Sequence, residues 1–355
     1  MTILLIGNGF DLAHGLNTKY SDFLEFVDEI QNKEDLNDCY LNEFNSLIKD
    51  NVWIKYFLKV YKERLKEGKE NWIDFEKEIS SKIQSFDALY KRIGNKRLST
   101  GTSNTTLNRN EWDSLSGLLK IINEEWNAIS SIKINQIKEI KNQLLIDLNR
   151  MTRSLEIYLA KEVEENPIDK IDFFESLSID KVLSFNYTNT YERLYGNENI
   201  EYDYIHGKAK LDNNINRCNL VLGIDEYLSD EEKDKNMEFI QFKKFYQRIY
   251  KQTGSYYKDW IKSICDFQNG EKNKKAIRLF NLKNRLIIFG HSLDITDKDI
   301  LKELILNEYI HTIIYYHDQE SLNQLITNLV KIIGEDNLIH YTGGENAKIT
   351  FKEFK

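Results

Sequence analysis

A short apolar run that stops at two glycines constrains the fold of this chain more than any other feature. The run Ile3–Ile6 contains no polar residue and is followed by Gly7, Asn8 and Gly9. An apolar run bounded by glycine is typical of a strand that is buried on both faces, as in a parallel sheet. The sequence therefore predicts an α/β protein whose first element is a strand of a mainly parallel sheet.

The loop after this run is the first candidate ligand site. Glycine lets the backbone approach a ligand closely, and ligands of open α/β sheets bind beyond the carboxyl ends of the strands. We therefore expect nucleotide phosphate contacts within Gly7, Asn8, Gly9, Phe10 and Asp11. A plain strand-to-loop turn would explain the same residues equally well.

Common nucleotide and metal motifs are missing from the sequence. Leu12 stands where the dinucleotide fingerprint needs its third glycine, so a hydride-transferring dehydrogenase is not predicted. The sequence has no Gly-Lys-Ser/Thr loop, which leaves a P-loop NTPase unsupported. It also has no His, Cys and Asp residues at metal-binding spacing, so no metal site is predicted.

Composition and charge narrow the class of protein. The 355 residues are 30% charged and 41% hydrophobic, as in soluble globular proteins of one or two domains. The net charge of −8 argues against broad nucleic-acid binding. Cys39, Cys218 and Cys265 are far apart and odd in number, which fits a reducing cytoplasm. With no signal peptide and a first apolar run too short to span a bilayer, we expect a cytoplasmic protein without membrane attachment.

Helical periodicity separates the first strand from the rest of the predicted sheet. Apolar residues recur at helical spacing from Lys19 to about Glu165 and again from about Asp230 to Phe267. The predicted core comprises residues 1–18, 168–229 and 276–355, with a helical insertion at 19–167 and a smaller one at 230–275. The further strands predicted in this core are Lys181–Phe185, Ile200–Ile205, Asn219–Leu222, Arg285–Phe289, Thr312–Tyr316 and Leu338–Tyr341.

The segment Lys91–Asn110 interrupts the helical pattern of the large insertion. It lacks apolar periodicity and is rich in Ser, Thr, Asn and Gly. This composition predicts a mobile loop that is dispensable for folding.

Small or polar residues follow each strong predicted strand. In a parallel sheet these strand ends lie along one edge, where they would form a ligand crevice. His206 could act there as a base near neutral pH, and Asn186 could orient a ribose or a water. A strand-end histidine bonded to backbone and a helix-capping asparagine would explain these two residues without any ligand. The other residues of the predicted crevice are Gly207, Gly223, Asp225, Gly290, His291 and Ser292.

Two further residues are weaker candidates for the same site. His14 lies one helical turn after Asp11, where packing or capping is the commoner role. Glu76 falls in the first turn of a predicted helix, a position where the helix dipole alone favours an acid. Because Glu76 shares a side with Trp72 and Ile79, its carboxylate could also face a pocket.

The order of these motifs resembles the AbiH family of bacterial phage abortive-infection proteins. The resemblance runs from end to end and implies an anti-phage role in the bacterial cytoplasm, with a phage-derived trigger and a second copy of the chain as candidate partners. The segments that carry it are Leu5–Leu16, Tyr20–Phe23, Trp72–Glu76, Ser184–Thr188, Ile205–Gly207, Leu222–Asp225 and Phe289–Leu293.

The same landmarks are similar, more distantly, to the sirtuin-like domains of anti-phage proteins, which bind NAD and in many cases hydrolyse it. This resemblance implies a Rossmann-like fold with large helical insertions. It places Asn186 and His206 on the catalytic asparagine and histidine of those domains. The positions that fall on their phosphate loop and on a later nucleotide-contacting turn are Gly7, Gly9, Gly290 and Ser292.

Two functions stay open because Asn8, Asp11, Thr188 and His291 depart from the pattern of those domains, with Thr188 in place of an aspartate. The first is an effector that hydrolyses NAD at the nicotinamide–ribose bond, with NAD as its substrate and no cofactor required. The second is a nucleotide-binding sensor or scaffold without catalysis, whose helical insertion binds a phage component. A nuclease toxin is a third reading, which the acidic net charge and the missing metal cluster disfavour.

Overall fold

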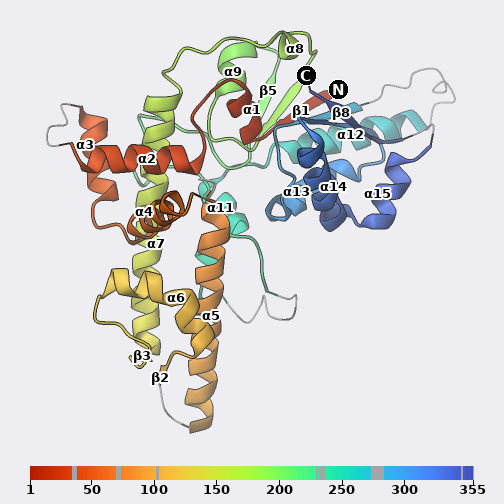
Figure 1. Cartoon of the computed structure of the whole chain (residues 1–355). Helices are drawn as coiled ribbons and strands as arrows, with labels where there is room; N and C mark the ends of the chain where they lie inside the picture. The colour runs from red at the N-terminus through yellow and green to blue at the C-terminus, as the bar shows by residue number, and fades with distance from the viewer. Residues whose placement is uncertain are drawn as a thin grey trace. The chain divides into compact units, whose positions relative to one another are not determined.

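The computed structural model describes residues 1–33, 38–68, 73–100, 104–228, 231, 237–272, 284–344 and 347–354 (Figure 1). Contacts within the chain divide it into two compact units, each built from separated segments. The sheet unit comprises Met1–Thr18, Val163–Ala209 and Gln252–Lys355, and the helical unit comprises Lys19–Glu162 and Lys210–Lys251. This division differs from the predicted one, which puts 210–229 in the core and 252–275 in an insertion.

The sheet unit is built on six strands that are all parallel, which confirms the predicted mainly parallel sheet. The spatial order is β5-β4-β1-β6-β7-β8, so that the six strands lie in the chain order 3-2-1-4-5-6. This is the strand order of the doubly wound dinucleotide-binding fold. The strands are β1 (Thr2–Ile6), β4 (Lys181–Ser184), β5 (Glu201–Tyr204), β6 (Asn284–Phe289), β7 (Ile310–Tyr316) and β8 (Ile349–Glu353).

The first apolar run is the central strand of this sheet. β1 pairs with β4 on one side and with β6 on the other, and Leu5 lies opposite Leu183 and Ile288. Its side chains alternate between two hydrophobic clusters, with Leu5 in one cluster and Leu4 in the other. Because both faces are buried, every residue of the run gains from being apolar, and the strand shows no polar alternation.

Helices cover both faces of the sheet, as a doubly wound fold requires. In Figure 1, α8 and α9 lie above the strands, and α12 to α15 lie below and to the right. The cluster that contains Leu4 takes side chains from α1 (Asn8–Ala13), α8 (Asp172–Glu175) and α9 (Thr190–Tyr195). The cluster that contains Leu5 takes them from α12 (Tyr257–Lys272), α13 (Lys298–Ile305), α14 (Gln319–Ile333) and α15 (Glu335–Thr342).

The helical unit is formed by most of the chain between the first two strands of the sheet, together with the segment 210–251. A short antiparallel pair, β2 (Asn104–Thr106) and β3 (Ser131–Lys133), accompanies its helices. The helices are α2 (Tyr20–Gln31), α3 (Cys39–Ile48), α4 (Val52–Lys66), α5 (Phe75–Thr100), α6 (Arg109–Ile122), α7 (Ile134–Ile157) and α11 (Lys244–Lys251), with a π-helical turn at Tyr158–Val163.

The predicted mobile loop Lys91–Asn110 is wrong over most of its described length. Residues 91–100 continue α5, residues 104–106 form β2, and residues 109–110 begin α6; residues 101–103 lie outside the described part. The Arg92 guanidinium donates to both carboxylate oxygens of Glu111, at 2.9 and 2.6 Å, and to the Thr106 carbonyl at 2.9 Å. Polar contacts hold this part of the helix, and a search for apolar periodicity cannot detect them.

Two of the predicted strands are also wrong. Asn219–Leu222 forms no strand, although Leu220 and Leu222 are fully buried, and the segment belongs to the helical unit. Leu338–Tyr341 lies within α15, and the last strand is β8. Both segments are short apolar runs, which a strand and a buried helix or loop can share.

Candidate functional site

The carboxyl ends of β1 and β6 lie where the strand order of the sheet reverses. Ligands of doubly wound sheets bind outside the carboxyl ends of the strands at such a switch point. Gly7 follows β1 and Gly290 follows β6, so the structure brings these two predicted site residues side by side. The ends of β4 and β5 continue the same edge, because Ser184 pairs with Tyr204 in parallel register.

The glycines at this point pack the two loops directly against each other. The Gly7 N–H donates to the Phe289 carbonyl at 3.1 Å, and the Gly9 N–H donates to the Gly290 carbonyl at 2.8 Å. A Cβ on Gly9 would lie 2.6 Å from the Cα of Gly290, so no side chain fits. The absence of a side chain is thus required for loop packing, and these two N–H groups are already bonded within the protein.

Asp11, the one acidic residue of the predicted phosphate loop, is buried. Its side chain is 1% exposed, and the Thr188 hydroxyl donates to Asp11 Oδ2 at 2.6 Å. Burial raises the pKa of Asp11 to about 6, against the opposing effects of Thr188, Thr190, Asn186 and Arg193. The other oxygen, Asp11 Oδ1, is buried and accepts no hydrogen bond from the described residues.

Asn186 lies beside Asp11, two residues past the end of β4. Its backbone N–H bonds the Ser184 hydroxyl at 3.2 Å, which fixes the turn. The side chain is buried, and neither Oδ1 nor Nδ2 has a hydrogen bond of good geometry within the described chain. It is nevertheless close enough to lower the pKa of the Asp11 carboxyl. A buried amide without partners is rare and costly, and is commonest where function requires it.

Glu164 is a second, half-buried acid at this place, and no sequence motif predicts it. Its carboxylate accepts the Asn189 backbone N–H at 2.8 Å. Burial raises the pKa of Glu164 to about 7, and the nearby Asp11 charge acts in the same direction. No sequence signal marks Glu164, because it lies in a polar stretch after a helix, far from Asp11 along the chain.

His206 and His291, both predicted site residues, form a separate cluster around Asp297, which no sequence motif marks. His206 Nε2 lies 3.2 Å from Asp297 Oδ1, and His291 Nε2 lies 3.6 Å from Asp297 Oδ2. His291 Nδ1 accepts the Leu293 N–H at 2.9 Å, so the proton of the neutral ring is on Nε2, facing the acid. All three side chains are less than a tenth exposed. Asp297 ends a short 3₁₀ turn, Ile295–Asp297, that precedes α13.

The predicted catalytic pair therefore belongs to two clusters at neighbouring strand ends. Asn186 lies with Asp11 and Thr188, whereas His206 lies with Asp297 and packs edge-on against the Phe185 ring. Ser184 of β4 pairs with Tyr204 of β5. Asn186 lies two residues after Ser184, and His206 lies two residues after Tyr204, so both occupy the same level of the sheet edge.

His14 is held by hydrogen bonds in a structural role. Its Nδ1 bonds the Phe10 carbonyl and its Nε2 bonds the Tyr195 hydroxyl, both at 2.8 Å. Since a carbonyl can only accept, Nδ1 carries the proton and Nε2 accepts from Tyr195. Burial lowers the pKa of His14, which fits a neutral ring. Phe10 is fully buried in the core and packs against Phe174, so its side chain faces away from solvent.

The remaining predicted residues of the sheet unit are positioned by the backbone. Gly207 adopts a positive φ of 82°, and its N–H closes a turn onto the Tyr204 carbonyl at 3.1 Å. The Ser292 carbonyl accepts the Asn328 side-chain amide at 2.9 Å, while the Ser292 side chain is exposed. Asn8 is also exposed. These positions lie at the carboxyl edge of the sheet, as the sequence predicted.

Gly223, Asp225 and Glu76 belong to the helical unit. A Cβ on Gly223 would lie 2.9 Å from the Lys244 nitrogen, so Gly223 allows a close backbone approach there. Glu76 pairs with Lys244 at 2.8 Å, and both side chains are largely buried. Asp225 accepts the Glu226 N–H at 2.7 Å. Glu76 thus has an ion-pair partner within its own unit.

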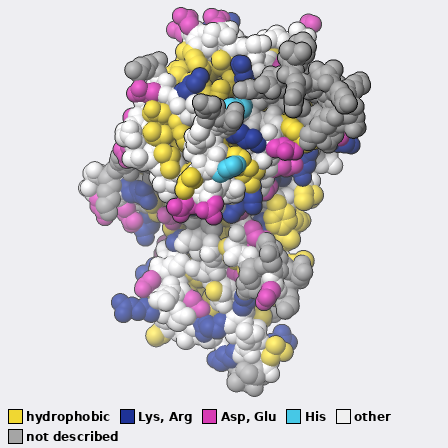
Figure 2. Space-filling model, turned by 90° about the vertical axis from the view of Figure 1, so that its right-hand side faces the viewer, with side chains coloured by type: hydrophobic (Ala, Val, Ile, Leu, Met, Phe, Trp, Pro, Cys, Tyr) yellow, Lys and Arg dark blue, Asp and Glu magenta, His cyan; other side chains and the backbone are white. Residues whose placement is uncertain are grey.

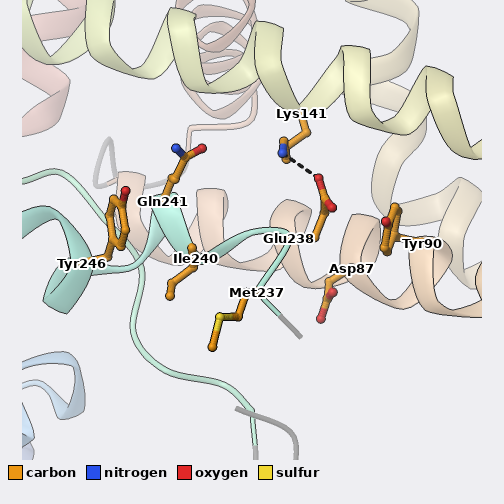
Figure 3. Close-up of a pocket in the computed structure, with 8 residues that line it drawn as sticks. All are labelled: Asp87, Tyr90, Lys141, Met237, Glu238, Ile240, Gln241 and Tyr246. Carbon is orange, nitrogen blue, oxygen red and sulfur yellow. Dashed lines mark hydrogen bonds and ion pairs between the residues drawn. The ribbon is translucent and has the colours of Figure 1, made fainter. Parts of the chain in front are cut away.

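Each unit contains a cavity of about 520 Å³. In the sheet unit, the cavity is lined by residues 13–17 and 166–171, which include His14. In the helical unit, side chains from α5, α7 and α11 line the cavity, where Lys141 and Glu238 form an ion pair at 2.6 Å (Figure 3). Neither set of lining residues contains Asn186 or His206.

The described residues contain no group of three or more His, Cys, Asp or Glu side chains arranged to hold a metal ion. Among the helices of the described ranges, none is long and apolar enough to cross a membrane. On the face drawn in Figure 2, Lys and Arg side chains are interspersed with Asp and Glu side chains.

A parallel sheet in the order 3-2-1-4-5-6, with helices on both faces and buried polar clusters at its carboxyl edge, defines a Rossmann-like α/β protein. The sequence model of the family described as "Bacteriophage abortive infection AbiH" matches residues 3–316. The chain belongs to this AbiH family, whose role is in bacteriophage abortive infection. The comparisons with curated proteins and with solved structures gave no significant match.

Proposed function

We propose that this AbiH-family protein stops the growth of an infected cell by hydrolysing NAD at the nicotinamide–ribose bond. The observation that carries the proposal is the His206–Asp297 pair at the end of β5, next to Asn186 at the end of β4. A buried histidine paired with a carboxylate can act as a base, and a buried asparagine without partners can bind a substrate group. The distant resemblance to sirtuin-like domains points to NAD as that substrate.

The chemistry of this bond suits the residues. The nicotinamide leaves as a neutral group from a cationic one, so the site needs no acid to protonate it. The transition state resembles an oxocarbenium ion, as in glycoside hydrolysis. Water adds to the ribose carbon and loses a proton, giving ADP-ribose, nicotinamide and one proton. The protein has to hold the ribose, place the water and accept the proton.

His206 is the proposed base for the water or for a ribose hydroxyl. Asp297 faces His206 Nε2, which places the proton of the neutral ring there and leaves Nδ1 as the basic nitrogen. Asp297 then stabilises the imidazolium that forms when Nδ1 takes up a proton. Asn186 is the proposed orienting group, since its amide offers both a donor and an acceptor to ribose hydroxyls. The glycine loop contributes by packing the strand ends together.

The test is nicotinamide release from NAD by the purified protein, with and without an extract of phage-infected cells to supply a trigger. The variant is Asp297→Asn, which keeps the shape of the side chain and removes the charge that faces His206. We expect nicotinamide release to fall at least about tenfold, since a correctly held base contributes roughly 10²–10⁴-fold. His317→Ala is the matched control, because His317 also follows a strand, β7, but is exposed and packs against the Phe289 and Phe354 rings instead.

Wild-type protein that binds NAD but releases no nicotinamide in either condition would contradict hydrolysis. That result would instead support the second candidate, a nucleotide-binding sensor without catalysis. Equal release by wild type and Asp297→Asn would remove the assigned role of the His206 pair.

A further inference from the structure

Among the described residues, the carboxylate of Asp11 accepts a hydrogen bond through one of its two oxygens. Thr190 donates to the Thr188 hydroxyl at 3.2 Å, and Thr188 in turn donates to Asp11 Oδ2 at 2.6 Å. These two consecutive hydrogen bonds hold the carboxylate through one of its oxygens. Asp11 Oδ1 accepts nothing within the described chain, although the side chain is almost fully buried. A purely structural acid at this depth would be expected to use both oxygens.

The Asn186 side chain, next to Asp11, also has buried polar atoms without a hydrogen-bond partner among the described residues. The Asn186 backbone is fixed by the Ser184 hydroxyl, but within the described ranges its side-chain amide has no hydrogen-bond partner of good geometry that would select one of its two orientations. A flip about the last side-chain bond exchanges the Oδ1 and Nδ2 positions, and only one of these orientations presents the acceptor to a ligand hydroxyl. The amide lies close enough to Asp11 to lower the pKa of its carboxyl.

We propose that Asp11 is a positioning residue for Asn186. Its Oδ1 attracts the Asn186 Nδ2 hydrogens and so turns Asn186 Oδ1 towards the bound ribose. This rests on the proposed function for the identity of the substrate, but the Asp11–Asn186 link itself does not. Hydrogen bonds in active sites are often long without substrate and tighten when it binds, which fits the imperfect contact.

The proposal makes the orientation of Asn186 depend on the charge of Asp11. An ionised carboxylate only accepts hydrogen bonds, whereas a protonated one can donate to the amide oxygen and select the opposite flip. Burial raises the pKa of Asp11 to about 6. The other groups that face it are Thr188, Thr190 and Arg193, which favour the ionised form, and Glu164, whose own pKa is raised to about 7 chiefly by burial.

The test is a pH titration of the Asn186 side-chain amide by NMR, on full-length protein labelled with ¹⁵N at asparagine. The Asn186 signal is assigned by its loss in Asn186→Ser. We expect it to shift with a midpoint near pH 6 in wild type and to lose that transition in Asp11→Asn. Asn328 is the control in the same spectrum, since its buried amide donates to the Ser292 carbonyl at 2.9 Å.

Thr188→Val provides a second variant in case Asp11→Asn does not fold. Removing the hydroxyl that donates to Asp11 Oδ2 should move the Asn186 midpoint to higher pH, because that hydrogen bond favours the ionised carboxylate. An Asn186 signal that stays constant from pH 5 to 8, or that follows the same course in Asp11→Asn, would overturn the proposal.

Turnover separates this proposal from the proposed function. We expect kcat for NAD to fall by about tenfold or more in Asp11→Asn with little change in KM, since orientation acts in the transition state. Wild-type protein that shows the amide titration but no NAD hydrolysis would leave the Asp11–Asn186 link standing and remove the NAD proposal. NAD hydrolysis by wild-type protein whose Asn186 signal does not titrate would support the NAD proposal and remove the Asp11–Asn186 link.

Discussion

At the scale of single residues, the structure places acidic side chains that the motifs do not mark beside the predicted strand-end residues. Asp11, which is predicted to contact a nucleotide phosphate, accepts a hydrogen bond from Thr188, and its other carboxylate oxygen has no partner in the described chain. Glu164 and Asp297, which no motif marks, complete the two clusters. A sequence shows which strand ends carry polar residues, but the face on which each side chain lies depends on packing that only the fold defines.

Glu164 should make the protein less stable as the pH rises. Its pKa is raised from 4.5 to about 7 on folding, so the folded state binds more protons than the unfolded state between these values. Stability is therefore fully present below about pH 4.5 and is lost as the pH rises to about 7, by up to about 3 kcal/mol. Glu164→Gln should lack this part of the pH dependence in urea unfolding at pH 5 and pH 8. The exposed Asp169→Asn should leave it unchanged, and identical profiles for Glu164→Gln and wild type would contradict the assignment.

Gly9 should tolerate no side chain, because of the loop that it packs against. A Cβ there meets the backbone of Gly290 at 2.6 Å, so Gly9→Val should lower the free energy of unfolding by about 3 kcal/mol. Gly94→Ala is the control, since nothing lies within 4 Å of its added Cβ and alanine is the better helix former by about 1 kcal/mol. A Gly9→Val protein with the wild-type melting temperature would show that the β1 and β6 loops do not pack as described.

At the scale of elements, apolar runs predicted strands correctly where both faces of the sheet are buried. They failed where polar contacts determine the local structure. β1, β4, β6 and β7 were all placed from continuous apolar residues. The same signal failed at Asn219–Leu222, because a buried loop in the helical unit needs apolar residues as much as a strand does. The prediction for the end of α5 failed for the opposite reason, because this part of the helix has a polar surface and is held by charged contacts.

The Arg92–Glu111 pair should hold the end of α5 against α6. Glu111 is 8% exposed and accepts two hydrogen bonds from Arg92, which is itself 37% exposed. Arg92→Ala leaves this acid without its cation and should cost about 2 kcal/mol, less than for a fully buried pair because Arg92 is partly solvated. Arg109→Ala, whose pair with Asp113 is exposed and 3.8 Å long, should cost less than about 0.5 kcal/mol. Chemical denaturation measures both; equal effects would mean that the Arg92 pair is no stronger than a surface pair.

At the scale of the whole molecule, the chain builds one sheet from segments that are far apart in sequence. The first strand pairs with strands that begin at Lys181 and Asn284. The parallel sheet, its helical interruption and the position of Asn186 and His206 at the strand ends could be predicted, because each depends on local patterns. The partners of His206 and Asn186 could not, because Asp297 and Asp11 are brought to them only by the strand order and by the helices that follow.

The most direct test of the central claim compares nicotinamide release from NAD by four proteins: wild type, His206→Ala, Asn186→Ala and the double variant. If the two residues act on one ribose, each single variant should lose roughly 10²–10⁴-fold in rate. The double variant should be little worse than either, since residues that act as a unit share one transition-state interaction. Near-normal release by His206→Ala, with an unchanged melting temperature, would contradict the claim.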